Sequence, residues 1–312
     1  MNIADLVLVI VIVLVFGAAV YGIVKNGKNG KHCSGCGGAC SGCSVEGCGS
    51  RTEPPKPKSR KNVKNIIGVV SGKGGVGKSL VTSLLAAEMV RKGYKVAILD
   101  ADVTGPSIPK TFGIHGQITA DPDGINPAQT ATGIKVMSIN LMLPQAHLPV
   151  AWRGPVITGI LNQFWDETNW EDIDYMFIDM PPGTSDVFLT VMHALPVDGI
   201  ITVSAPQELV AMIVGKAVNL AHDMGKQVIG LVENMAYFKC DECGKDHYIF
   251  GEPQGKVVAK RYQIPALATL PLDPTFARMC DEGKIEEYDV EGALNPIIDQ
   301  IEAVAARKEA AE

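Results

Sequence analysis

Residues 68–79 read Gly-Val-Val-Ser-Gly-Lys-Gly-Gly-Val-Gly-Lys-Ser, and the last eight fit the pattern G-x-x-x-x-G-K-[ST]. The apolar run Ile66–Val70 overlaps its start and a helical pattern follows, which is the context in which this motif forms a phosphate-binding loop. We expect Lys78 to reach the β and γ phosphates of ATP and Ser79 to ligate Mg²⁺. The remaining phosphate contacts are expected from the free backbone N–H groups of Gly72, Lys73, Gly74, Gly75, Val76 and Gly77.

Three carboxylates are expected at the same edge of the sheet as this loop. Asp100 and Asp102 follow the apolar run Val96–Leu99, and Asp179 ends another apolar run at a turn rich in Pro and Gly. The carboxyl ends of parallel strands meet at one edge, where carboxylates can hold Mg²⁺ through water or orient an attacking water. Asp186 either caps the helix that begins there or acts as a switch residue, and the sequence leaves both roles open.

From Asn62 onward, short β-rich apolar runs alternate with longer helical patterns. The alternation is typical of repeated βαβ units and predicts an α/β fold with a mainly parallel sheet flanked by helices. The expected strands are Ile66–Val70, Val96–Leu99, Met176–Ile178, Gly199–Val203, Val228–Val232 and Ala268–Leu270. The expected helices are Lys78–Lys92, Gly154–Trp165, Asp186–Ala194, Leu209–Met224, Gln254–Tyr262 and Ala293–Lys308. The stretch Gly116–Leu143 has Asp-Pro-Asp-Gly between apolar runs, which predicts a β-hairpin insertion.

The N-terminal segment Ile3–Val24 is 22 residues long and carries a single charge, Asp5. As a helix it would be about 33 Å long, enough to span a bilayer. A cleaved signal peptide would need a basic start, and a buried core helix would show an amphipathic period. Basic residues follow the segment at Lys25, Lys28 and Lys31. We therefore expect a single-pass anchor in the cytoplasmic membrane, with the N-terminus outside and the remainder in the cytoplasm.

Residues 25–61 are rich in Gly, Ser, Lys, Pro and Cys, hold almost no large apolar residue, and are therefore expected to form a flexible tether. Five cysteines fall within sixteen of these residues, at Cys33, Cys36, Cys40, Cys43 and Cys48. The first four are candidate ligands for iron or zinc, the alternatives being a tether for a cluster donor and a passive linker. The expected organisation is an anchor at 1–24, a tether at 25–61 and an ATPase domain at 62–312.

Charge is distributed unevenly along the chain. The first 62 residues carry a net charge of +5, so that with −6 for the whole chain the remainder carries −11. An acidic body of this kind argues against nucleic acid as a partner.

A second group of cysteines, Cys240 and Cys243, follows an expected strand with C-x-x-C spacing. A tetrahedral Zn²⁺ or an iron–sulfur cluster takes four ligands, so two such pairs from two subunits would complete a site. The alternatives are a disulfide, which is uncommon in the cytosol, and a zinc site closed by His247. Cys280 stands alone in a helical pattern and fits a small buried apolar residue better than a ligand.

Lys73 lies one residue into the loop, and this second lysine makes the motif resemble the deviant Walker A loop of the ParA, MinD and nitrogenase iron-protein (SIMIBI/MinD-like) class. In that class the extra lysine reaches the nucleotide of a partner subunit, so the resemblance implies a homodimer with ATP between its subunits. It also implies that Asp102 positions the attacking water and that Asp179 is the Walker B acid. Asp100 would contact magnesium indirectly, through another ligand. The implied catalytic set is Lys73, Lys78, Asp102 and Asp179.

Four further motifs accompany the loop: Asp100-Ala-Asp-Val-Thr-Gly-Pro-Ser-Ile-Pro109, Trp152-Arg-Gly-Pro155, Asp179-Met-Pro-Pro-Gly-Thr-Ser-Asp186, and Glu233-Asn-Met with the cysteine pair. Together with the loop they resemble the Mrp/ApbC (Nbp-type) iron–sulfur carrier ATPases, over about residues 62 to 305. The resemblance implies a dimeric ATPase that holds a labile [4Fe–4S] cluster between two Cys240/Cys243 pairs and passes it to apoproteins. From the wider class, Asn234 and the turn at Pro271-Leu-Asp273 would contact adenine.

The first 50 residues pair one apolar segment with a Cys/Gly tail and resemble the small FeoB-associated Cys-rich membrane proteins. The leading hypothesis is an ATP-driven iron–sulfur cluster carrier at the membrane, with a cluster donor and apo iron–sulfur proteins as partners. The main alternative is a MinD/ParA-like positioning ATPase with a structural zinc site. The alternative leaves the C-x-x-C without a role in positioning, and the C-terminal stretch Ile298–Glu312 offers a poor membrane-binding face. A third hypothesis is a zinc-stabilised adaptor with residual ATPase activity.

Overall fold

The computed structural model describes residues 62–311, apart from residues 103, 104, 106, 117, 123, 144–153, 184, 185 and 207–209. The expected membrane segment Ile3–Val24, the tether at 25–61 and the cysteines Cys33, Cys36, Cys40, Cys43 and Cys48 lie outside the described residues. Within the part of the chain that is described, no helix has both the length and the apolar composition needed to cross a membrane.

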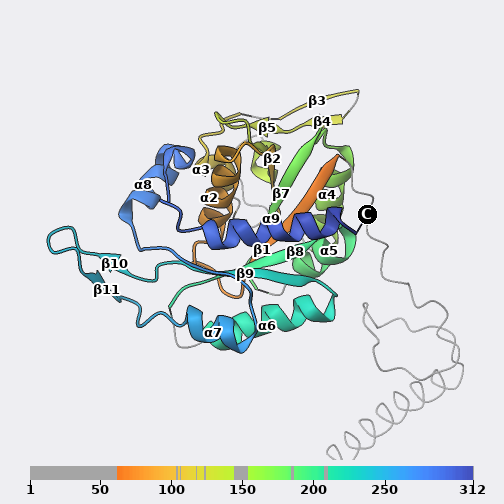
Figure 1. The fold of residues 1–312 in the computed structure, drawn as a ribbon. Helices are drawn as coiled ribbons and strands as arrows, with labels where there is room; N and C mark the ends of the chain where they lie inside the picture. The colour runs from red at the N-terminus through yellow and green to blue at the C-terminus, as the bar shows by residue number, and fades with distance from the viewer. Residues whose placement is uncertain are drawn as a thin grey trace, which may run out of the picture. The chain divides into compact units, whose positions relative to one another are not determined.

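An eight-stranded sheet forms the centre of the described domain, in the order β12-β9-β8-β1-β7-β2-β6-β5 (Figure 1). The strands are β1 (Val63–Ser71), β2 (Val96–Asp100), β5 (Ala128–Gln129), β6 (Lys135–Met137), β7 (Ile173–Asp179), β8 (Gly199–Ser204), β9 (Gln227–Glu233) and β12 (Leu267–Thr269). Neighbouring strands pair in parallel except β5 and β6, which confirms the expected mainly parallel sheet. The central strands are buried on both faces, which is why their sequences are apolar runs without alternation.

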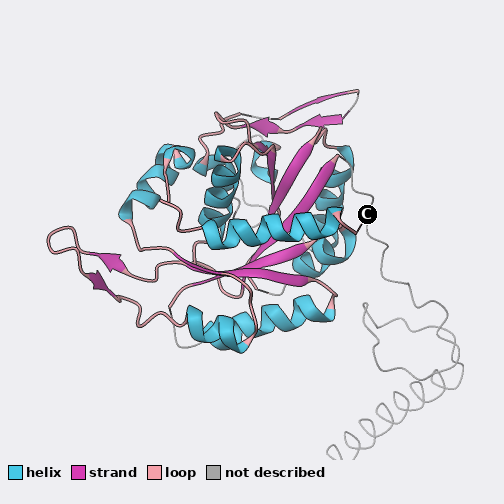
Figure 2. Cartoon of the chain, viewed as in Figure 1, coloured by secondary structure: helices cyan, strands magenta, loops and turns pink. Residues whose placement is uncertain are grey.

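Helices cover both faces of the sheet (Figure 2). One face packs against α2 (Lys78–Arg91), α3 (Ile108–Thr111), α8 (Pro274–Glu282), the 3₁₀ helix η2 (Ile285–Glu287) and α9 (Asn295–Glu309). The other packs against α4 (Gly154–Glu167), α5 (Asp186–Ala194) and α6 (Val210–Asp223), while α7 (Gly255–Arg261) packs beside α6 and β9. A second 3₁₀ helix, η1 (Ile139–Leu141), follows β6. This layering places the carboxyl ends of β1, β2 and β7 at one edge.

Two small antiparallel pairs complete the elements described. The first joins β3 (Thr119–Asp121) to β4 (Gly124–Asn126), and the second joins β10 (Phe238–Lys239) to β11 (Asp246–His247). In Figure 1 the β10–β11 hairpin projects from the body of the domain.

All six expected strands and all six expected helices are present, with ends within three residues of the prediction. The interpretation of Gly116–Leu143 as a hairpin insertion needs correction. The β3–β4 hairpin forms at the expected turn, but β5 and β6 from the same stretch join the main sheet, and β6 pairs in parallel with β2. Strands of two or three residues are too short to show an alternating pattern in the sequence. Their place in the sheet depends on the strands with which they pair. Helix α8 was also absent from the prediction.

Candidate functional site

The phosphate-binding motif lies where β1 ends and α2 begins. Gly75 and Gly77 both have φ of 81°, in the left-handed region that favours glycine. A Cβ on Gly77 would lie 2.2 Å from Nδ2 of Asn234, so no larger residue fits there without displacing Asn234. The loop is thus shaped by glycine at the positions where backbone N–H groups are needed for phosphate.

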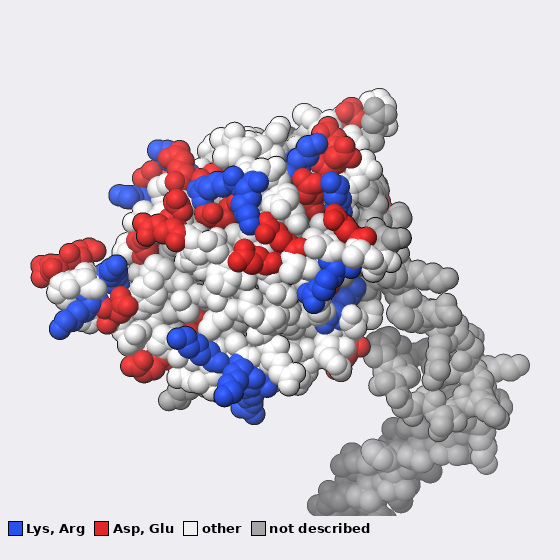
Figure 3. Space-filling view, viewed as in Figure 1, with Lys and Arg blue, Asp and Glu red and all other residues white. Residues whose placement is uncertain are grey.

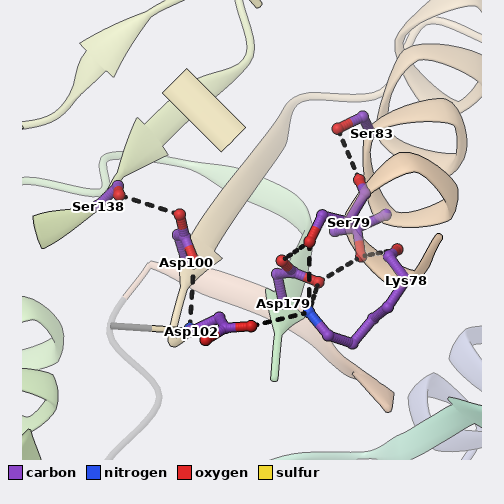
Figure 4. A network of polar contacts seen from close by, with 8 residues as sticks. Lys78, Ser79, Ser83, Asp100, Asp102, Ser138 and Asp179 are labelled. Atoms are coloured by element: carbon purple, nitrogen blue, oxygen red, sulfur yellow. Dashed lines mark hydrogen bonds and ion pairs between the residues drawn. The ribbon is translucent and has the colours of Figure 1, made fainter. Parts of the chain in front are cut away.

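Lys78, the first residue of α2, contacts the carboxylate that ends β7. Its Nζ lies 2.6 Å from Oδ1 of Asp179, and the two side chains are 6% and 0% exposed (Figure 4). Two hydroxyls donate to the same carboxylate, Ser79 Oγ at 2.6 Å and Thr82 Oγ1 at 3.0 Å. The structure therefore brings together Lys78, Ser79 and Asp179 as the sequence predicts. Thr82 was missed, although its position one helical turn after Lys78 is a signal that places it on the same face.

A second carboxylate lies beside this cluster, on the neighbouring strand. Asp100 is paired in register with Asp179, and it is held by Ser138 Oγ at 3.0 Å from its Oδ2. Its Oδ1 accepts the backbone N–H of Asp102 at 3.2 Å, and Asp102 Oδ2 lies 3.9 Å from Nζ of Lys78 (Figure 4). Ser138 could not be found from sequence, because only the pairing of β6 with β2 brings it there.

The two buried carboxylates share one buried cation. Burial raises the pKa of Asp100 well above its usual range, the neighbouring Asp179 carboxylate raises it further, and Ser138 and Lys78 oppose the shift. Burial also raises the pKa of Asp179, against the contrary effect of Lys78 and the two hydroxyls. The site is therefore short of positive charge. Its hydroxyl and carboxylate oxygens are the ligands that Mg²⁺ prefers, so the donor set fits that ion.

Lys73 lies in the same loop, but its side chain is exposed, unlike the buried Lys78. Because it is exposed, the Lys73 side chain is accessible to a second molecule. Asp186, whose role the sequence leaves open, is the first residue of α5.

The end of β9 connects the phosphate loop to the cysteine hairpin. Asn234 donates from Nδ2 to the carbonyl oxygen of Val76 at 3.0 Å and is 1% exposed. The preceding Glu233 is 0% exposed, and its carboxylate accepts the backbone N–H groups of Gln254 at 2.8 Å and Gly255 at 2.9 Å. Asn234 thus contacts the phosphate loop, and Glu233 binds the far end of the segment that carries both cysteines.

Replacing Glu233 with alanine should destabilise the domain. Two backbone amides would lose their acceptor, and the buried one, at Gly255, should cost about 1–3 kcal/mol when left unsatisfied. Glu233→Gln keeps one acceptor oxygen and should cost less. Urea denaturation measures the change, with Glu252→Ala as the control because that side chain is exposed. Equal stability of Glu233→Ala and Glu252→Ala would contradict the assigned contact.

Asn234 and Pro271, the two residues expected near adenine, lie on neighbouring segments but have different side-chain surroundings. Asn234 lies against the phosphate loop, whereas Pro271 lines a cavity of about 770 Å³ together with Tyr237 and Cys240. Asp273, from the same turn, accepts the N–H of Thr275 at 2.7 Å and so caps α8. No phosphate-loop residue lines this cavity among the residues described. The cavity instead adjoins the cysteine hairpin.

Cys240 and Cys243 lie at the turn of the β10–β11 hairpin, close to His247. One ligand atom from each of the three residues lies within 4.8 Å of the other two. Cys243 and His247 are exposed and Cys240 is partly so. The backbone N–H groups of Cys243 and Glu242 lower the pKa of the Cys240 thiol by hydrogen bonding to its sulfur, which favours the thiolate that binds metals.

Cys280 is not part of this cluster. It is half-buried on α8, and burial raises the pKa of its thiol. It packs against the core, as the sequence suggests for a small apolar residue.

The hairpin tip is charged as well as accessible. Lys239, Asp241, Glu242, Lys245 and Asp246 are all exposed. Figure 3 shows acidic and basic side chains together on this projection. A tip of this composition stays solvated, which leaves the thiols reachable from outside the domain.

Comparison with known proteins agrees with this arrangement. Residues 62–305 match the family described as NUBPL iron-transfer P-loop NTPases, and residues 2–49 match the FeoB-associated Cys-rich membrane proteins. The chain is 45% identical over 260 residues to an iron–sulfur cluster carrier protein of Clostridium perfringens, covering 81% of this chain and 91% of that protein. The match over residues 62–305 includes both the phosphate loop and the cysteine hairpin.

Two solved structures resemble the described domain. A nucleotide-binding protein of Archaeoglobus fulgidus, in complex with ADP and with cobalt found, is 43% identical with a TM-score of 0.67, covering 73% of this chain and 90% of that one. The cell division ATPase MinD of Pyrococcus furiosus is 20% identical with a TM-score of 0.54, covering 78% and 99%, and indicates the fold alone.

Proposed function

Since the chain belongs to the family of NUBPL iron-transfer P-loop NTPases, we propose that it is an ATP-hydrolysing carrier that holds a labile [4Fe–4S] cluster between two copies of itself and transfers it to apoproteins. The observation that carries the proposal is the β10–β11 hairpin. It presents two accessible thiols on the same chain as a phosphate loop with its lysine and carboxylates.

We assign a role in ATP binding and hydrolysis to each residue of this site. Loop residues 72–77 donate backbone N–H groups to the phosphates, and Lys78 exchanges Asp179 for phosphate oxygens. Ser79, Asp179 and Asp100 are the residues that would hold Mg²⁺, and the ion would neutralise charge on the phosphates. Asp102 orients the attacking water. Lys73, which is exposed, reaches the nucleotide of the partner copy.

The cluster is the cargo, and its ligands come from two copies. One chain offers Cys240 and Cys243, whereas a [4Fe–4S] cluster takes four thiolates. A homodimer that brings two hairpins together supplies the set. This accounts for a hairpin that projects from the domain and keeps its thiols near the surface (Figure 1).

ATP and cluster are coupled through the end of β9. Asn234 contacts the phosphate loop, and Glu233 holds the start of α7, where the hairpin segment returns to the domain. A change in loop position on nucleotide binding or hydrolysis therefore acts on both ends of this segment. We assign to that movement the change in how tightly the cluster is held.

The N-terminal segment is proposed to anchor the carrier to the cytoplasmic membrane, with the ATPase domain in the cytoplasm. The match of residues 2–49 to FeoB-associated Cys-rich membrane proteins supports this assignment. A cluster donor and apo iron–sulfur proteins would be the partners at that surface.

A MinD/ParA-like positioning ATPase is a weaker candidate. Its support is a likeness of fold at 20% identity. Helix α9, which would have to bind the membrane from the C-terminal end, buries Ile297, Ile298 and Ile301 in the core. Its apolar face is therefore already used.

Anaerobic reconstitution of the full chain with iron and sulfide tests the proposal. We expect about four iron and four sulfide per two chains in a dimeric fraction, with a visible absorbance that air destroys. MgATP should change the rate of transfer to an apo-ferredoxin. A full-length variant with Cys33, Cys36, Cys40, Cys43 and Cys48 replaced by serine is the control, and it should retain this cluster. Iron that disappears with those five cysteines would overturn the assignment to the hairpin.

A further inference from the structure

The β10–β11 hairpin holds three metal-binding side chains within one chain. We propose that a single copy binds one divalent transition-metal ion through Cys240, Cys243 and His247. The inference rests on the proposed function in that it uses the same two thiols. It differs from the shared cluster in three ways: His247 is a third ligand, one ion binds per chain, and no second copy is needed.

Strand pairing explains why His247 lies on the same side as Cys240. Phe238 is directly opposite His247 in the antiparallel ladder, so their side chains share one face. Cys240 comes two residues after Phe238, and alternation returns it to that face, diagonal to His247. The N–H of Cys240 donates to the carbonyl of Lys245 at 2.9 Å, which continues the ladder by one pair.

The turn brings the second thiol back to the first. Gly244 N–H donates to the carbonyl of Cys240 at 2.8 Å, and Gly244 has φ of 67°, a left-handed conformation that favours glycine. Cys243 precedes this glycine. Its Sγ is thereby directed to the side of the hairpin where Cys240 and His247 already lie.

The spacing of the ligand atoms suits a single ion. Bond lengths of about 2.3 Å to sulfur and about 2.0 Å to nitrogen place tetrahedral ligand atoms about 3.5–3.8 Å apart. The three ligand atoms here are within 4.8 Å of one another. The three side chains are exposed or partly exposed, so we expect their rotation to close the difference.

The donor set selects the kind of metal. Two thiolates and an imidazole suit Zn²⁺, Fe²⁺ and Co²⁺, whereas Mg²⁺ and Ca²⁺ prefer oxygen. A divalent ion also neutralises the two thiolates. Three protein ligands leave the fourth tetrahedral position open, and exposure of Cys243 and His247 makes that position accessible to water or to a ligand from another protein.

The single-ion site and the cluster site exclude each other, because both take both thiolates. His247 is needed only for the single ion, since a second copy supplies the other two ligands of the cluster. A chain loaded with one ion is therefore unable to share a cluster until that ion leaves.

Cobalt titration of the full chain tests the site, because Co²⁺ bound to thiolates gives a charge-transfer absorbance. The five tail cysteines, Cys33, Cys36, Cys40, Cys43 and Cys48, are replaced by serine so that only the hairpin supplies clustered thiols. We expect one Co²⁺ per chain in the monomeric fraction. His247→Ala should weaken binding by about tenfold or more, since loss of even an indirect contact costs metal sites about 10- to 100-fold.

Two further variants separate ligation from structure. His222→Ala removes an exposed histidine on α6 and should leave the affinity unchanged. His247→Cys restores a ligand and should recover tight binding. Equal affinity of His247→Ala and the parent, or half a Co²⁺ per chain shared by a dimer, would overturn the inference. Iron–sulfide reconstitution of His247→Ala should still succeed, and its success would leave the proposed carrier function standing even if the cobalt result failed.

Discussion

Replacing Lys78 with alanine should reduce ATP hydrolysis by about 100-fold or more, the scale on which removal of one donor from a charged transition state acts. Lys78 is buried in the first turn of α2, and its Nζ lies 2.6 Å from Oδ1 of Asp179. We assign it to the phosphates when ATP binds. A coupled assay of phosphate release at saturating MgATP measures the loss. Hydrolysis at the parental rate would contradict the assignment of the loop.

The control for this experiment follows from the same contact. Lys78→Ala also leaves Asp179 buried without its cation, and breaking a buried pair by removing one partner costs about 3–5 kcal/mol. In Lys78→Ala/Asp179→Ala the charge of Asp179 is gone and only Asp100 is left without Lys78, so stability should rise part of the way back while hydrolysis stays lost. Thermal unfolding of both variants therefore distinguishes loss of phosphate contacts from loss of the fold.

The core of the site was predictable because its residues stand at ends of strongly apolar strands. Asp100 and Asp179 end β2 and β7, and Lys78 follows β1 across the loop at 72–77, so parallel pairing brings all three to one edge. Ser138 was not predictable. It follows β6, a three-residue strand whose place beside β2 depends on long-range pairing.

The start of α8 illustrates a different limit. Asp273 and Pro274 carry a helix-start signal, a capping residue followed by proline at the first helical position. The resemblance to nucleotide-binding relatives instead implies an adenine contact at the Pro271-Leu-Asp273 turn. The carboxylate of Asp273 caps α8 by accepting the N–H of Thr275, and it also accepts the hydroxyl of Tyr288, while the adenine contact at this turn stays a prediction.

In the β10–β11 hairpin, the cysteine spacing predicts a metal site but not the position of its third ligand. C-x-x-C predicts a metal site from two nearby thiols, and the sequence left His247 as one of several ways to complete it. Only the register of β10 with β11 places His247 on the face of Cys240. A strand of two residues has no pattern from which that register could be read.

Replacing Cys240 and Cys243 together with alanine should remove the cluster that reconstitution builds on the hairpin. We expect iron and sulfide to fall to background in a protein whose five tail cysteines are already serine, because no second pair of clustered thiols then remains. Transfer to an apo-ferredoxin should be lost with them. Thermal stability should change little, since Cys243 is exposed and Cys240 is partly so.

Cys280→Ser is the matched control, because Cys280 is half-buried on α8 and burial raises the pKa of its thiol. Its replacement should leave iron and sulfide at parental levels even if it lowers stability. The double variant should also keep hydrolysing ATP, since Lys78, Asp102 and Asp179 belong to a separate cluster. Parental iron in the double variant would place the cluster elsewhere and remove the reason for a dimer at the hairpin. Loss of iron with hydrolysis retained would instead separate the two sites, leaving Glu233 and Asn234 as the contacts through which one acts on the other.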